Sequence, residues 1–186
     1  MKNSNKGFSL LEISIVLSIM GILMGFAIKG RGIIEMARVK SVISQIENYQ
    51  SMIQLFVEKY GGYPGDIADA EHVLGSENGR MDGNISSIED VQRFWNHLNK
   101  SGLISLSMTA SIPTTKLGGK LLVKTDNDGS RWIILCSSNS THEQYYGFLS
   151  EEIARNIEKS MDIGDLNSGD VRGVKTSDKY YLMFRV

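Results

Sequence analysis

The chain has 186 residues, of which 41% are hydrophobic and 22% are charged, so its composition excludes an intrinsically disordered protein. Its formal net charge of −1 argues against a broad binding surface for nucleic acids or other polyanions. Cys136 is the single cysteine, which excludes an intramolecular disulfide. Because Cys136 ends the apolar run 132–136, we expect a small core residue rather than a reactive thiol.

The first segment of the chain predicts a membrane anchor. Residues 1–7 form a short polar leader with two lysines, and residues 8–28 form an apolar run. As a helix, this run is long enough to cross a hydrocarbon core about 30 Å thick. It is longer than the core of an ordinary secretory signal, which spans roughly 7–15 residues. Four cations then follow within twelve positions, as expected at a membrane flank: Lys29, Arg31, Arg38 and Lys40.

Glu12 is the one acidic residue within this apolar run. An ionised carboxylate inside a bilayer span is unfavourable by about 2.5 kcal/mol or more, so Glu12 should have a partner. No basic residue lies one helical turn away. Cleavage between Gly7 and Phe8 would create an α-amine four residues before Glu12. In a packed array, that amine could pair with Glu12 of a neighbouring subunit.

The stretch Gly7-Phe8-Ser9-Leu10-Leu11-Glu12 resembles the precursor motif of type IV pilins and of the pseudopilins of type II secretion. The resemblance implies that prepilin peptidase cuts after Gly7 and N-methylates Phe8. It also implies that Glu12 orders the docking of subunits. The family often has a proline where this chain has Lys29, so the resemblance does not predict a kink there.

Residues 29–60 predict an amphipathic continuation of the same helix. Apolar residues recur at steps of three and four from Ile33 to Tyr60, which marks one helical stripe. Gly61-Gly62 and Pro64 predict its end. The first half of the helix is expected in lipid or a filament core, and the second half against a globular head at 61–186.

Two further helices and four strands are predicted in the head. The sequence indicates a helix capped by Ser86 or Ser87 and closed by Gly102, and another from Glu151 to Met161 capped by Ser150. Strands are expected at 120–125, 131–137, 145–149 and 179–186, with a hairpin turn at 126–129. The predicted fold class is therefore α+β and pilin-like: a long N-terminal helix, membrane-spanning and then amphipathic, packed on a small antiparallel sheet.

The head is similar, in a more limited way, to a group of bacterial prepilin-type proteins. The similarity is carried by Tyr63-Pro-Gly-Asp66, by the helix around Trp95 that ends in Gly-Leu-Ile104, and by Ser168-Gly-Asp-Val171. It supports a pilin-like head and does not identify a particular machine.

A calcium loop is one interpretation of residues 78–89. Compared with an EF-hand loop, the glycine at the sixth position permits the sharp turn, but Arg80 stands where an oxygen ligand is expected. A surface turn before a capped helix explains the same residues. The candidate calcium ligands are Asn78, Asp82, Asn84 and Glu89. Apart from this possible calcium, no cofactor is predicted.

The sequence favours a structural protein over an enzyme. It has no nucleophile elbow, phosphate-binding glycine loop or Cys-x-x-Cys pair, and its three histidines have no metal-binding spacing. The leading prediction is a subunit of a type IV pilus-like filament or type II secretion pseudopilus. The alternative is a minor or tip pilin-like protein, tethered to the membrane, that binds a ligand, calcium or DNA.

The resemblance also implies partners and a location. The partners are prepilin peptidase, an inner-membrane assembly platform and other pilin-like subunits, whereas nucleic acid is not favoured. The precursor is expected to cross the bacterial inner membrane once, with its leader in the cytoplasm and its head in the periplasm. It then enters a filament in the periplasm or at the cell surface.

Overall fold

The computed structural model describes residues 8–65, 85, 87–106, 112–162 and 164–186. These described residues form three helices and four strands. They are α1 (Leu10–Tyr60), α2 (Ile88–Lys100), β1 (Lys120–Thr125), β2 (Arg131–Cys136), α3 (Glu151–Met161), β3 (Val171–Thr176) and β4 (Lys179–Arg185). The α+β class predicted from the sequence, a long N-terminal helix and a small antiparallel sheet, is confirmed.

The long helix α1 continues across Lys29, where the family often has proline. It ends at Gly61, whose φ of 76° is the left-handed conformation that glycine adopts without a steric penalty. The Gly61 N–H donates to the Val57 carbonyl at 2.8 Å, which closes the last turn. Burial of the apolar stripe begins at Val39, whereas Ile33 and Met36, which precede it in the stripe, are exposed.

Serine caps begin the other two helices, as the sequence predicts. Ser87 caps α2 in a capping box: its hydroxyl accepts from Asp90 N–H, and the Asp90 carboxylate accepts from Ser87 N–H. Ser150 caps α3 by accepting from Ile153 N–H at 3.4 Å. Gly102, with φ of 77°, follows α2.

The four strands form one antiparallel sheet in the order β1-β2-β4-β3. Strands β1 and β2 are joined by the predicted turn at 126–129. Asp126 N–H donates to the Ser130 carbonyl at 2.8 Å, and Gly129 has the required positive φ of 83°. A two-residue turn, Ser177-Asp178, joins β3 to β4.

The strand predicted at 145–149 is wrong. These residues make only an isolated bridge between Leu149 and Tyr180, and the N–H groups of Phe148 and Leu149 both donate to the Tyr180 carbonyl. Gly147 lies against the backbone of residues 179–180, so closely that a Cβ atom would fall 2.5 Å from the Lys179 carbonyl carbon. Two donors on one acceptor interrupt the alternating ladder that a strand requires.

Strand β3 was not predicted from the sequence. Its two apolar residues, Val171 and Val174, are three positions apart and so lack the period of two that marks a strand. Its glycine has a packing role, since a Cβ atom at Gly173 would lie 2.6 Å from Leu166. Gly173 N–H also donates to the Leu166 carbonyl at 2.8 Å, which covers part of this edge strand.

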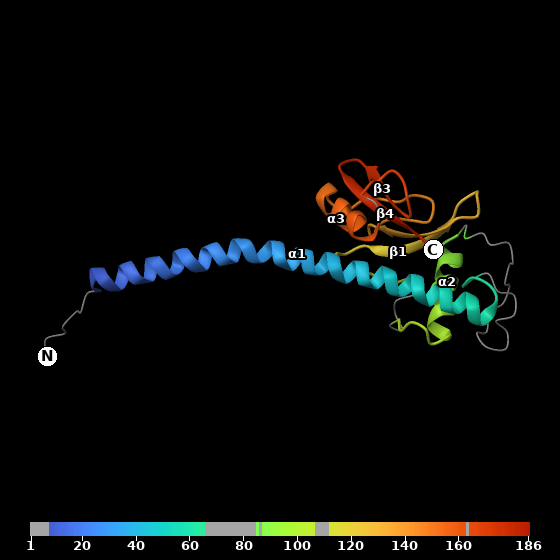
Figure 1. Ribbon diagram of the computed structural model, residues 1–186, viewed down its shortest axis with the longest axis horizontal. Coiled ribbons are helices and arrows are strands. Elements are labelled where there is room, and N and C mark those ends of the chain that lie inside the picture. Colours follow the sequence, from blue (N-terminus) through green and yellow to red (C-terminus); the bar gives the residue numbers. More distant parts are fainter. Residues whose placement is uncertain (1–7, 66–84, 86, 107–111, 163) are drawn as a thin grey trace. The chain divides into compact units, whose positions relative to one another are not determined.

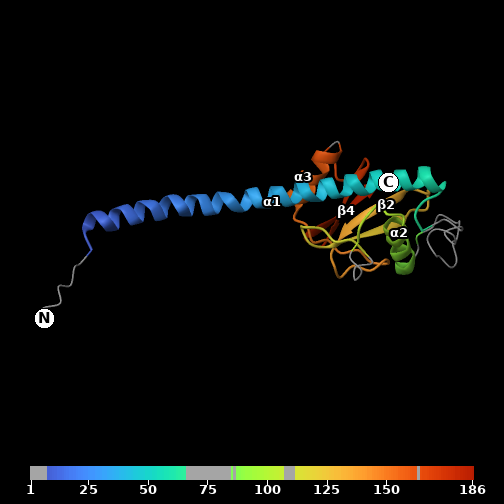
Figure 2. The same cartoon turned by 90° about the horizontal axis from the view of Figure 1, so that it is seen from below.

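The core of the head is formed by α1 from Val39 onward, α2, α3 and the sheet. Figures 1 and 2 show α3 beside β3 and β4, and α2 beside the end of α1. Trp95 of α2 is fully buried; its ring meets Tyr49 of α1 edge-on, and its indole N–H donates to the Leu121 carbonyl of β1 at 3.0 Å. Trp132 is also buried, and Cys136 is buried as predicted.

Candidate processing and assembly site

Ser9 and Glu12 both cap the start of α1. The Ser9 hydroxyl accepts from Leu11 N–H at 3.3 Å, and the Glu12 Oε2 atom accepts from Ser9 N–H at 2.8 Å. The Ser9 carbonyl accepts the first helical hydrogen bond from Ile13 N–H at 3.2 Å. The carboxylate therefore satisfies a backbone N–H that the helix itself leaves without a partner.

This geometry is compatible with cleavage after Gly7. The N–H that Glu12 accepts belongs to the Phe8–Ser9 peptide bond, which follows the bond between Gly7 and Phe8. Hydrolysis of the Gly7–Phe8 bond therefore leaves both hydrogen bonds of the cap possible. The other carboxylate oxygen of Glu12, Oε1, has no hydrogen-bond partner among the described residues. It is free to accept from a donor on another subunit. Gly7 itself lies outside the described residues.

The apolar side chains on both sides of Glu12 are exposed in the described structure. Leu10 is 92% exposed, Leu17 64% and Met24 71%. The hydroxyls in this stretch are satisfied within the helix: Ser14 donates to the Leu11 carbonyl and Ser18 to the Ser14 carbonyl, each at 2.8 Å. By length and composition, α1 could cross a membrane. Its exposed surface and internal hydrogen bonds suit an apolar environment.

Comparison with known proteins agrees with this geometry. Residues 2–28 match the model of the prokaryotic N-terminal methylation motif. This segment carries the signature of type IV pilins and pseudopilins. The motif indicates a substrate of prepilin peptidase that is anchored in a membrane and assembles with other pilin-like subunits. No curated protein and no solved structure matches the chain.

The capping role of Glu12 was missed in the sequence analysis, which found no partner for this residue within one chain. The signal was present, since Ser9-Leu-Leu-Glu12 has the Ser-x-x-Glu spacing of a capping box. The hydrogen bond to Ser9 supplies a donor but no positive charge. Glu12 has no ion pair among the described residues, so the expectation of an external counter-charge stands.

The possible calcium loop falls mostly outside the described residues. Asn78, Asp82 and Asn84 lie outside them, and Glu89 is an exposed residue in the first turn of α2. Within the part of the chain that the structure describes, no group of three or more His, Cys, Asp or Glu side chains could hold a metal ion. Calcium binding stays a prediction.

His97 of α2 is buried, with 2% of its surface exposed. Its Nδ1 atom accepts from Gly65 N–H at 3.0 Å, which requires this nitrogen to be unprotonated. Burial, together with the nearby charges of Arg93 and Lys100, lowers the pKa of His97 to about 4. The ring is therefore a neutral core group at neutral pH.

Acidic side chains near the C-terminal end of α3 accept hydrogen bonds from the backbone of the segment that follows this helix. Glu158 is 1% exposed, and its Oε1 atom accepts from the N–H groups of Gly164 and Asp165, each at 2.8 Å. The Asp162 Oδ2 atom accepts from the N–H groups of Asp170 and Val171. These carboxylates tie the chain between α3 and β3 without a disulfide.

Proposed function

We propose that the chain is a structural subunit of a type IV pilus-like filament or a type II secretion pseudopilus. Prepilin peptidase cuts between Gly7 and Phe8 and methylates the new amine of Phe8. Before assembly, α1 anchors the protein in the inner membrane with the leader in the cytoplasm and the head in the periplasm. The observation that supports this proposal is an exposed apolar helix that begins at Leu10, has Glu12 in its first turn and carries the methylation motif.

The role of Glu12 in assembly follows from its two oxygens. One oxygen caps the subunit's own helix, and the other is free to accept the amine of Phe8 from a neighbouring subunit. Because both groups are charged and surrounded by apolar side chains, their attraction is far less screened than at a protein surface. The pair can therefore fix the axial position of one helix against the next.

A substitution at Glu12 tests the proposal. We expect Glu12→Ala to be processed at the normal rate but to reduce the yield of sheared filaments roughly tenfold or more, because the unpaired amine of Phe8 would be left in an apolar environment. The matched control is Glu35→Ala, which removes an exposed acid from the same helix beyond the apolar run. Immunoblots of whole cells report the ratio of precursor to mature chain, and the sheared fraction reports assembly.

Two results would count against the proposal. A normal filament yield in Glu12→Ala would reject a role of this residue in assembly. An equal loss of filament yield in Glu35→Ala would show that any change of charge on the helix impairs assembly. Counting the subunits in purified filaments by quantitative mass spectrometry then distinguishes an abundant subunit from a minor or tip component.

A further inference from the structure

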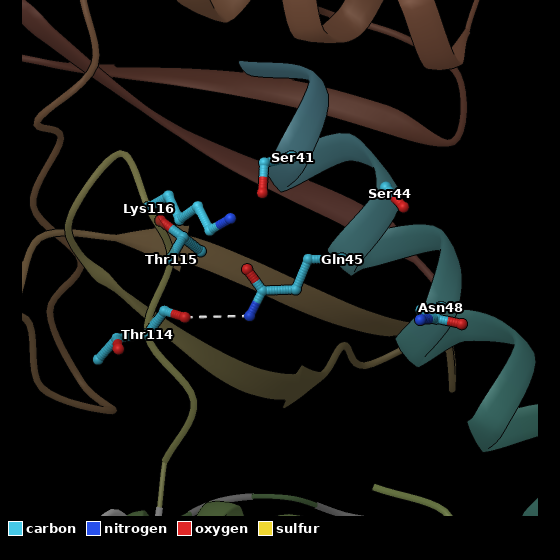
Figure 3. A pocket seen from close by; sticks show the side chains of 7 residues that line it. All are labelled: Ser41, Ser44, Gln45, Asn48, Thr114, Thr115 and Lys116. Atoms are coloured by element: carbon cyan, nitrogen blue, oxygen red, sulfur yellow. Dashed lines mark hydrogen bonds between the residues drawn. The ribbon is translucent and has the colours of Figure 1, made fainter. Parts of the chain in front are cut away.

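A polar groove of about 470 Å³ lies between α1 and the loop that precedes β1 (Figure 3). Its volume falls in the range of sites for small molecules. All the residues that line it are polar, one is cationic and none is acidic or aromatic: Ser41, Ser44, Gln45, Asn48, Thr114, Thr115 and Lys116.

Hydrogen bonds hold the two walls of the groove in place. The Gln45 side-chain amide donates to the Thr114 carbonyl at 3.0 Å and to the Tyr49 hydroxyl at 3.2 Å, as the dashed line in Figure 3 shows for Thr114. On the opposite wall, Gly118 N–H donates to the Thr115 carbonyl at 3.0 Å, and the Thr115 hydroxyl donates to the Gly118 carbonyl. The groove is therefore largely pre-formed.

The serine hydroxyls of the groove differ from others on α1. Ser18 and Ser51 each donate to a carbonyl one turn earlier in the helix. Ser41 and Ser44 make no such bond, and no described residue accepts from them. Their hydroxyls are available to a ligand as donors and as acceptors.

The charge of the groove comes from Lys116. Lys124, in the next strand, is paired with Asp126 at 2.8 Å. Lys116 has no ion pair or hydrogen bond with any described residue. Figure 3 shows its ammonium group directed into the space between the two walls. An ammonium group only donates, so its ligand must supply an acceptor, and a negatively charged oxygen is the strongest one.

We infer that this groove binds a small polyhydroxylated oxyanion of the sugar-acid class. Lys116 takes the carboxylate of the ligand, while the hydroxyls of Ser41 and Ser44 and the amide of Asn48 exchange hydrogen bonds with its hydroxyl groups. An inorganic anion would fill only a small part of the volume. This inference goes beyond the proposed assembly role, which assigns no ligand to the head.

The test uses the full chain in detergent micelles and three probes: D-glucuronate, D-glucose and inorganic phosphate. We expect calorimetry to give a Kd of about 1 mM for glucuronate and at least roughly tenfold weaker binding of the other two probes. Lys116→Gln should weaken glucuronate binding at least tenfold. The matched control is Lys159→Gln, which removes an exposed lysine from α3. Ser44→Ala should weaken binding by a smaller factor.

Each of the opposite outcomes overturns a stated part of the inference. Absence of glucuronate binding in a chain whose tryptophan emission shows an intact core rejects the site. If Lys116→Gln and the unchanged chain bind glucuronate equally, the proposed contact between Lys116 and the ligand carboxylate is rejected. Equal affinity for glucose rejects the preference for an oxyanion, and equal affinity for phosphate rejects the role of the ligand hydroxyls. None of these results depends on filament assembly.

Discussion

The two stretches of α1, before and after Val39, contain similar apolar side chains in opposite environments. Phe26 is 69% exposed, whereas Phe56 is fully buried against the head. All the buried hydrophobic residues of the described structure lie at Val39 or beyond. The difference teaches that the apolar content of a helix does not show whether its side chains are buried by the same chain, by lipid or by other subunits. The earlier stretch needs lipid or other subunits to remove its side chains from water, because the described part of the chain leaves them exposed.

The largest expected effect comes from truncating one phenylalanine in each stretch. Phe56→Ala should reduce the free energy of unfolding of the head by about 3–5 kcal/mol, since it leaves a cavity in a packed core. Phe26→Ala should change it by less than about 0.5 kcal/mol, since no core contact is lost. Urea unfolding in detergent, followed by the emission of Trp95 and Trp132, measures both. A comparable loss of unfolding free energy in Phe26→Ala would contradict the contrast between the two stretches of α1.

His97 should make the stability of the head depend on pH. Its pKa is about 4 in the folded state and near 6.5 when unfolded, so the unfolded chain binds more protons between these values. This contribution is complete above pH 6.5 and is lost as the pH falls to about 4, with a total near 3 kcal/mol. Urea midpoints measured across that interval for the unchanged chain and for His97→Gln give the difference. If the unchanged chain and His97→Gln showed the same pH dependence of stability, that dependence would come from groups other than His97.

A smaller effect is expected at Glu158. Glu158→Ala leaves the N–H groups of Gly164 and Asp165 without their acceptor and should reduce the free energy of unfolding by about 2 kcal/mol. Glu158→Gln keeps an acceptor oxygen and should lose less. The exposed control is Glu151→Ala, which removes an ion pair with Arg155 at 2.9 Å and should cost about 0.5 kcal/mol or less. Equal losses at the two positions would contradict the role of the buried carboxylate.

Elements whose ends are set by local chemistry could be predicted from the sequence. Ser87 and Ser150 as caps, Gly61 as a helix end and the turn ending at Gly129 all act through hydrogen bonds or φ angles within a few residues. The motif around Glu12 is equally local, because the hydrogen bond of its Ser-x-x-Glu cap joins residues only three positions apart.

Elements that depend on distant partners could not be predicted. Gly173 allows β3 to pass under Leu166, and Gly147 allows residues 145–149 to approach β4 without joining the sheet as a strand. In both cases, the pattern of residues within each segment does not show which other segment will lie beside it. The same holds for the groove, since Ser44 and Lys116 come together only when α1 packs beside the loop before β1.

The position where burial begins has a practical consequence for production. A shortened chain that starts at Val39 keeps all the buried hydrophobic residues of the described structure and both tryptophans, and it loses the long exposed apolar run. Such a fragment should be purified from the aqueous fraction without detergent, so that binding to the groove beside Lys116 can be measured in buffer alone.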